Sequence, residues 1–333
     1  MFQNRKQLLE KIEESFEGKS ILYVTSDRPN LEAKIAGDSY DIFVEHLDKI
    51  GVCKRICLII YSRGGETLSA WSIINLIRMY CDELFMIIPS RAHSAATLMS
   101  LAANKIIMTK QATLGPIDPS VNGPLNPQIP GAPPIIKTPV SVEEINGYLE
   151  LVNDIGISES CDKTKIFLEL SRQVHPIVLG NVYRSRSQIR MLAKRLISNQ
   201  IDNTDKIEKI LNFMCSESGS HDYTINRREA KKELGLKVDK PSDEQYKIIK
   251  ELFDDFSSEL ELNSPFNPEI FLADADRKEY SFKRCLIESR ERGSDYLVSE
   301  GIFVKSQAPQ GHPNHPGMLI DNQKIFEGWK HEA

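Results

Sequence analysis

Short apolar runs alternate with stretches of helical spacing along the first third of the chain. Four runs have the length and apolar content of strands: 20–25, 55–61, 84–88 and 105–108. Between them, apolar residues recur every three or four positions, for example over residues 68–77. Runs this apolar are typical of strands that are covered on both faces. Their alternation with helices predicts a sheet of parallel strands joined by helical crossovers.

The remaining chain divides at its proline-rich and polar stretches. Residues 115–139 are rich in glycine and proline, which predicts a loop. Amphipathic helices are indicated at six places: the first twenty residues, 38–50, 142–152, 163–172, 181–198 and 242–260. A last strand is indicated at 284–288. We therefore expect an N-terminal helix, a main α/β domain and a C-terminal helical and tail extension: 1–19, 20–240 and 241–333.

The composition is that of a globular protein with room for a sizeable core. Of the 333 residues, 41% are hydrophobic and 27% are charged, which excludes collagen-like and disordered chains. The formal net charge of −5 gives no electrostatic reason to expect nucleic acid as a partner. Six scattered cysteines, with no second pair that matches Cys53 and Cys57, favour buried free thiols over disulfides or zinc. No metal and no cofactor is expected.

The sequence contains no recognisable targeting or membrane signal. Apolar positions among the first twenty residues alternate with Lys and Glu, so they do not form the apolar core of a signal peptide. No stretch reaches about 18 consecutive apolar residues, which a spanning helix requires. We therefore expect a soluble, cytoplasmic protein without a membrane span.

Two segments carry residues that suit nucleophilic chemistry. Gly64-Gly65 follows a buried strand and precedes a helix, so its main-chain N–H groups are uncovered and can bind an oxyanion. Ser94 has small residues after it and opens a second strand–helix junction, where the positive helix end favours a nucleophilic hydroxyl. Taken alone, a diglycine is usually a turn and a serine before a helix is usually a cap. Only their pairing points to catalysis.

Six blocks of the sequence resemble one protein family in order and spacing. They are Ser62-Arg-Gly-Gly65, Ala92-His-Ser-Ala-Ala-Thr97, residues 101–108, Leu114-Gly-Pro-Ile-Asp-Pro119, residues 179–184 and residues 221–236. The family is that of the serine dehydrogenase proteinases, archaeal and bacterial proteins with the Clp protease fold. The resemblance implies an α/β, Clp/crotonase-like fold of ββα units, here with a helical C-terminal elaboration.

The resemblance also implies an ATP-independent serine endopeptidase. Its triad would be Ser94, Asp118 and His221, in a chain order that differs from that of Clp proteases. Chain order is immaterial, because catalysis requires only that an imidazole reach the hydroxyl and that a carboxylate orient the imidazole. The implied partners are a peptide or protein substrate and further copies of the chain in a homo-oligomer.

The implied oxyanion hole is formed by main-chain N–H groups at Gly64, Gly65 and Ala95. One departure from the family concerns the residues after the nucleophile. The family often has a glycine there, whereas this chain has Ala95 followed by Ala96. We expect the extra methyl groups to narrow the space for a substrate main chain and to make the peptidase weak or selective.

Other side chains compete for the supporting roles. His93 adjoins Ser94, but neighbouring side chains usually point apart, and Asp222 could orient a histidine as well. Lys137 could form a Ser–Lys dyad with Ser94 if it is desolvated enough to lose its proton. Residues interpreted as structural are Glu66 and His175 at helix starts, and His312 and His315 in an exposed turn.

Two other functional classes share this fold. An acyl-CoA hydratase or isomerase would use the same pair of amides, but it leaves a serine at the nucleophile position unexplained. A non-catalytic scaffold would bind a partner protein without any convergence of Ser94, Asp118 and His221.

Overall fold

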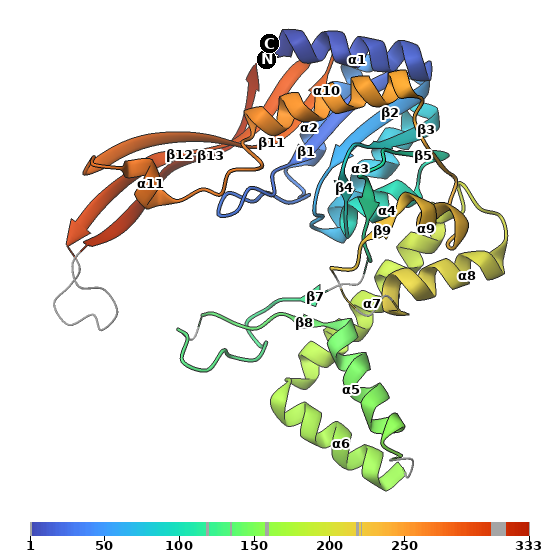
Figure 1. Cartoon of the computed structure of the whole chain (residues 1–333). Helices are drawn as coiled ribbons and strands as arrows, with labels where there is room; N and C mark the ends of the chain where they lie inside the picture. The colour runs from blue at the N-terminus through green and yellow to red at the C-terminus, as the bar shows by residue number, and fades with distance from the viewer. Residues whose placement is uncertain are drawn as a thin grey trace.

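The computed structural model describes residues 2–117, 120–133, 135–156, 160–217, 220, 222–307 and 318–332. Its centre is an eight-stranded sheet in the order β10-β5-β3-β2-β1-β11-β12-β13 (Figure 1). One half of this sheet is parallel and consists of β1 (Lys19–Thr25), β2 (Cys53–Tyr61), β3 (Cys81–Ile88), β5 (Lys105–Met108) and β10 (Val238–Asp239). The parallel sheet that the sequence predicts is confirmed.

Helices cover both faces of the parallel strands. The connecting helices α2 (Ser39–Ile50), α3 (Thr67–Met79) and α4 (Ala95–Leu101) pack on one face. The helices α1 (Phe2–Phe16) and α10 (Asp243–Glu259) lie next to each other on the other face (Figure 1). Four of these helices fall where the apolar spacing predicts a helix, and α4 begins at the strand–helix junction predicted at Ser94.

The alternation of side chains along β2 explains why its sequence is almost continuously apolar. Leu58 and Ile60 belong to the core on the α2–α4 side, whereas Cys57 and Ile59 belong to the core under α1 and α10. All four side chains are fully buried. Because both faces of β2 are packed, a polar side chain pointing to either face would lose its contact with water.

A second, three-stranded sheet follows the carboxyl ends of β2 and β3. It consists of β4 (Arg91–Ala92), β6 (Thr113–Leu114) and β9 (Ile225–Asn226), with β6 in the centre. In chain order, β3, β4 and α4 form one of the expected ββα units. These two-residue strands are too short to produce a periodic pattern, and the sequence analysis does not predict them.

The proline-rich segment and the first two helices after it extend away from the main sheet (Figure 1), whereas the later helices return to the core on the α2–α4 side. Within that segment β7 (Ser120–Val121) pairs with β8 (Val140–Ser141), and most of the described residues between them are irregular, as expected for a loop. The helices that follow are α5 (Val142–Asp154), α6 (Ser160–Gln173), α7 (Pro176–Ile197), α8 (Thr204–Asn212), the π-helix η1 (Phe213–Glu217) and α9 (Arg227–Lys232). The first three confirm predicted helices.

The C-terminal part differs from the expected helical extension. It contains α10 and the short α11 (Pro268–Leu272), but three long antiparallel strands follow: β11 (Arg277–Ser289), β12 (Gly293–Gln307) and β13 (Met318–Glu332). The predicted strand at 284–288 lies within β11, which pairs with β1. Residues on both sides of position 240 therefore share one sheet. The stretch 308–317, with His312 and His315, lies outside the described residues.

Two expectations about the whole chain can be compared with the structure. Five cysteines within the described ranges are free thiols: Cys53, Cys57, Cys81, Cys215 and Cys285. No helix in the described parts of the chain is both long enough and apolar enough to pass through a bilayer.

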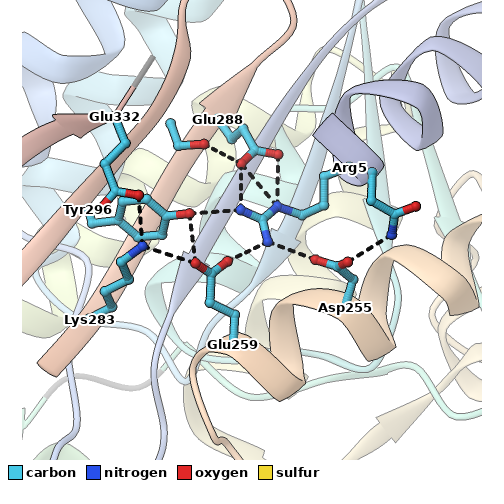
Figure 2. A network of polar contacts seen from close by, with 9 residues as sticks. Arg5, Asp255, Glu259, Lys283, Glu288, Tyr296 and Glu332 are labelled. Carbon is cyan, nitrogen blue, oxygen red and sulfur yellow. Dashed lines mark hydrogen bonds and ion pairs between the residues drawn. The ribbon is translucent and has the colours of Figure 1, made fainter. Parts of the chain in front are cut away.

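A buried charge network joins the start of the chain to its C-terminal strands (Figure 2). Arg5 on α1 has no exposed surface. Its Nε and Nη2 donate to the Glu288 carboxylate on β11 (3.0 and 2.8 Å), and Nη2 also donates to Tyr296 Oη on β12 (2.8 Å). Its Nη1 donates to Asp255 (2.7 Å) and Glu259 on α10. One guanidinium thus holds α1, α10 and the C-terminal strands together.

Candidate active site

The two segments that the sequence pairs lie next to each other. Ser62, directly after β2, forms a β-bridge with Ala92 of β4. The Ser62 N–H donates to the Arg91 carbonyl (3.1 Å), and the His93 N–H donates to the Ser62 carbonyl (3.0 Å). This bridge holds the diglycine that follows Ser62 against the start of α4.

Ser94 occupies a strained turn between β4 and α4. Its φ of 52° and ψ of −117° lie in a region that residues with a side chain rarely adopt. Although Ser94 is the N-cap residue of α4, its side chain makes no capping hydrogen bond. Its hydroxyl has no hydrogen-bond partner among the described residues, and the residue is half-buried. An ordinary capping role therefore does not explain this serine, whereas a strained strand-to-helix turn is typical of an exposed nucleophile.

Gly64 is required by its contact with this turn. A Cβ on Gly64 would lie 2.7 Å from Ser94 Cβ and 3.0 Å from the Ala95 nitrogen, and the φ of Gly64 is 108°. Gly65 is equally constrained, because a Cβ there would overlap the main chain of Ile35. The Ile35 N–H donates to the Gly64 carbonyl (2.9 Å), and the Glu66 N–H donates to the Ile35 carbonyl (2.8 Å).

Two main-chain donors beside Ser94 are available to a ligand. Ala95 is the first residue of α4, so its N–H has no acceptor within the helix. Within the described ranges, neither this N–H nor that of Gly65 donates to a protein group. The N–H of Gly64 is different, because it donates to Ser62 Oγ (2.9 Å). Of the three expected oxyanion donors, the N–H groups of Gly65 and Ala95 are therefore free. The role of Gly64 is to leave room for the Ser94 turn, because it has no side chain.

The methyl groups of Ala95 and Ala96 do not narrow the site as expected. Ala95 is 2% exposed and Ala96 is fully buried, and both belong to the core on the α2–α4 side of the sheet. Because these methyl groups pack beneath the nucleophile turn, they stabilise the start of α4 and leave the space above Ser94 unchanged.

Ser62 and Thr25 support the glycine loop, and the sequence analysis does not identify either. The buried Ser62 Oγ accepts from the Gly64 N–H and from Thr25 Oγ1 (2.7 Å). The loop is thereby tied to the end of β1. Both residues lie at the carboxyl ends of neighbouring parallel strands, which is the edge where sites in such sheets usually form. Their position at the ends of two predicted strands was the signal in the sequence that could have identified them.

Asp27 is a second supporting residue that the sequence analysis does not identify. Its carboxylate accepts from Tyr61 Oη (2.8 Å), from Arg91 Nη1 (2.6 Å) and from Arg63 Nε (3.1 Å). Arg63 precedes the diglycine and Arg91 begins β4, so Asp27 links both segments of the site. Burial, together with the nearby Asp27 carboxylate, raises the pKa of Tyr61 above its ordinary value.

Of the residues considered for the supporting roles beside Ser94, the structure describes the competing candidate His93 but neither of the two expected triad members, Asp118 and His221. His93 packs against Gly115, and its Nε2 lies 2.9 Å from Thr113 Oγ1 on β6. Asp118 and His221 lie outside the described residues. Asp222, the alternative orienting carboxylate, is exposed.

Lys137 is half-buried and forms an isolated antiparallel bridge with Gln128 in the irregular segment between β7 and β8. No described contact joins Lys137 to Ser94. His175 caps α7 by accepting from the Ile177 N–H (3.2 Å), which confirms its structural interpretation. Glu66 is the N-cap residue of α3, at the helix start where it was expected.

Replacing Ser62 with alanine tests the support of the glycine loop. The variant leaves the Gly64 N–H and the Thr25 hydroxyl without their buried acceptor, so we expect a stability loss of about 1–3 kcal/mol. Because the loop is no longer fixed beside Ser94, kcat for a reaction at this serine should fall about 10- to 100-fold, with a smaller change in KM. Steady-state kinetics and urea unfolding measure the two effects.

Ser100→Ala is the matched control for this variant. Ser100 is also a fully buried serine, but its hydroxyl donates to the Ala96 carbonyl (2.8 Å) inside α4. It should lose stability without a comparable loss of kcat. Equal kcat values in the two variants would contradict a positioning role for Ser62.

A parallel sheet with a serine in a strained turn, beside two free amides at the carboxyl edge, is an arrangement typical of serine hydrolases. The chain belongs to the family of ClpP-like SDH-type serine proteinases, whose sequence pattern matches residues 45–260. This confirms the family and the Clp-like fold that the sequence analysis expects.

Known relatives and solved structures are similar over part of their length. The protein MJ0137 of Methanocaldococcus jannaschii, which is uncharacterized, is 30% identical to this chain over 60% of its residues. A second uncharacterized protein of that organism, MJ1495, is 27% identical over 55% of this chain. The matches span 59% and 51% of those relatives, so the chain covers little more than half of their length.

Two solved structures are also similar. A mutant of the 1510-N membrane-bound stomatin-specific protease is 15% identical over 68% of this chain and 82% of that one, with a TM-score of 0.36. A mutant of ClpP1 from Listeria monocytogenes is 15% identical over 71% of this chain and 98% of that one, with a TM-score of 0.37.

Proposed function

We propose that this protein is an ATP-independent serine endopeptidase in which Ser94 is the nucleophile, His221 the general base and Asp118 the residue that orients His221. The observation that carries the proposal is the geometry of Ser94. Its uncapped hydroxyl sits in a strained turn, in contact with Gly64 and next to the free N–H groups of Gly65 and Ala95. Strain of this kind is typical of functional sites.

The proposed reaction has two halves. His221 accepts the Ser94 proton while Ser94 Oγ forms a bond to the carbonyl carbon of a peptide, and the carbonyl oxygen becomes an oxyanion held by the N–H groups of Gly65 and Ala95. The intermediate collapses, the C–N bond breaks, and His221 returns the proton to the leaving amine. Water then repeats the sequence on the acyl-enzyme and releases the carboxylic acid.

The pairing of the small sheet supports the choice of Asp118 and His221. Leu114 of β6 pairs with Ala92, two residues before Ser94, and with Ile225 of β9. Leu114 lies four positions before Asp118, and Ile225 lies four positions after His221. Four residues of extended chain span at most about 14 Å. The described neighbours of all three proposed residues therefore lie within one sheet.

A fluorophosphonate probe tests the proposed function. We expect stoichiometric labelling of the native protein, with mass spectrometry locating the adduct on Ser94, and release of new amino termini from an unfolded protein substrate without ATP. If the protein turned over an acyl-CoA and Ser94→Ala kept that activity, the proposed peptidase activity would be wrong and a hydratase or isomerase activity would take its place. Absence of both labelling and turnover would indicate a scaffold.

We further propose that the chain forms a homo-oligomer. Support comes from the lobe of α5–α7, where large apolar side chains are more than half exposed: Leu151, Ile155, Phe167, Leu168, Ile177 and Tyr183. Clusters of exposed apolar residues of this kind usually mark interaction surfaces. Cytoplasmic location stays a prediction.

A further inference from the structure

A pocket of about 570 Å³ near α9 is lined almost entirely by cationic side chains. Six of its lining residues are basic: Lys110, Arg227, Arg228, Lys231, Lys232 and Lys240. The seventh, Asn226, caps α9 by accepting from the N–H groups of Arg228 and Glu229 (2.9 and 3.1 Å). Among the residues that the structure describes, no carboxylate lines this pocket, although the chain as a whole carries a net charge of −5.

Three separate segments of the chain converge to form this basic pocket. Lys110 follows β5 by two residues, and Lys240 directly follows β10, its parallel neighbour in the sheet. Arg228, Lys231 and Lys232 are at positions i, i+3 and i+4 of α9, so they share one face of that helix. Because the cations come from different elements, their proximity is fixed by the fold and is not a consequence of one basic stretch of sequence.

Most of this positive charge is not neutralised by the protein. Lys231 pairs with Asp239 (3.0 Å), Arg227 donates to the Met108 carbonyl (3.0 Å), and Lys110 Nζ lies 4.6 Å from the centre of the Tyr246 ring. The side chains of Arg228, Lys232 and Lys240 have no hydrogen-bond or ion-pair partner in the described part of the chain, and both Arg228 and Lys232 are exposed. Like charges gathered in this way repel one another, so a bound anion would stabilise the folded protein.

We propose that this basic pocket binds an oligophosphate, an anion that carries several phosphate groups in a small volume. The pocket has the size of a small-molecule site. A single carboxylate could neutralise one of its six cations, whereas each phosphate group brings between one and two negative charges and several acceptor oxygens. Arginine binds such groups with two parallel hydrogen bonds, and lysine binds them as a point charge.

The location of the basic pocket fits a ligand site. The carboxyl ends of parallel strands are the usual edge for ligands in open α/β sheets, and both β5 and β10 end at this pocket. The same edge carries Ser62 and Ser94 after β2 and β3. The oligophosphate site is nevertheless independent of the proposed peptidase, since none of its residues has a role in that reaction.

Isothermal titration calorimetry of the full chain with inorganic triphosphate tests the proposal. We expect saturable binding at one site per chain, weakening with added salt, and weaker binding of pyrophosphate and orthophosphate in that order. Arg228→Glu combined with Lys232→Glu should weaken triphosphate binding by about tenfold or more, because charge-assisted hydrogen bonds are lost and two repulsive charges are introduced.

The matched control is Lys11→Glu combined with Lys54→Glu, which makes the same charge change at exposed lysines on α1 and β2. Its triphosphate affinity should stay within about twofold of wild type, since distant exposed charges are screened by salt. Equal weakening in the two double variants would mean non-specific attraction and would overturn the proposal, as would absence of saturable binding. Binding of a hexaglutamate peptide in place of triphosphate would overturn the phosphate assignment.

Discussion

Replacing Ser94 with alanine is expected to lower kcat for peptide hydrolysis by about 10⁴- to 10⁶-fold, because the variant keeps the binding surface and the amide donors but lacks the attacking oxygen. Fluorophosphonate labelling should disappear completely. The stability of the variant should equal or exceed that of wild type, since Ser94 makes no capping hydrogen bond. Peptide release, probe labelling and thermal unfolding measure the three outcomes.

Ser90→Ala is the matched control, because Ser90 is another half-buried serine four residues earlier. It should retain kcat within about twofold, as expected for a substitution away from the reacting atoms. If Ser94→Ala retained a substantial part of the wild-type activity and labelling, Ser94 would not be the nucleophile.

The same assay distinguishes the two possible bases. If His221 is the base, the kcat of His221→Ala should be nearly as low as that of Ser94→Ala. The kcat of the double variant should be no lower, because the effects of substitutions within one catalytic unit are not additive. Lys137→Ala should then retain activity within about twofold. The opposite pattern would establish a Ser–Lys dyad.

The sequence predicts the parts of this fold whose signal is local. β2 is recognisable because both of its faces are packed, so Cys57 to Ile60 are all apolar. β12 is different: Asp295 and Ser299 are buried in polar contacts with His46 and Glu327, which lie far away in the sequence, and such polar residues are expected at a surface. A buried polar residue that is satisfied by a distant partner cannot be recognised from its own neighbours in sequence.

The candidate site divides in the same way. Gly64, Gly65 and Ser94 can be predicted because unusual backbone geometry selects glycine and because a serine at a helix start is visible in sequence. Ser62, Thr25 and Asp27 were not predicted, since their roles depend on hydrogen bonds between residues 36 to 64 positions apart. Such contacts are set by strand order, which the local pattern does not encode.

Replacing Arg5 with methionine is expected to destabilise the protein strongly. Glu288 is fully buried and has the Arg5 guanidinium as its charge partner, whereas the nearly buried Glu259 also pairs with Lys283 (3.0 Å) (Figure 2). Removing one member of a buried ion pair leaves an uncompensated charge and lowers the free energy of unfolding by about 3–5 kcal/mol. For a chain of this size the loss corresponds to a fall in Tm of roughly 4–7 °C, measurable by calorimetry. Lys11→Met, an exposed cation on the same helix, should change Tm little.

The pH dependence of this loss identifies its electrostatic cause. Burial raises the pKa of Glu288 above its ordinary value, and the hydrogen bond and charge of Arg5 oppose that rise. Without Arg5 the pKa of Glu288 should rise further. A carboxyl group whose pKa is raised by folding stabilises the folded state while it is protonated, and this contribution is lost as the pH increases. The stability difference between Arg5→Met and wild type should therefore be smaller at about pH 5 than at about pH 8. A difference that does not change between these pH values would attribute the effect of Arg5 to packing alone, and adding Glu288→Gln to Arg5→Met would then recover no stability.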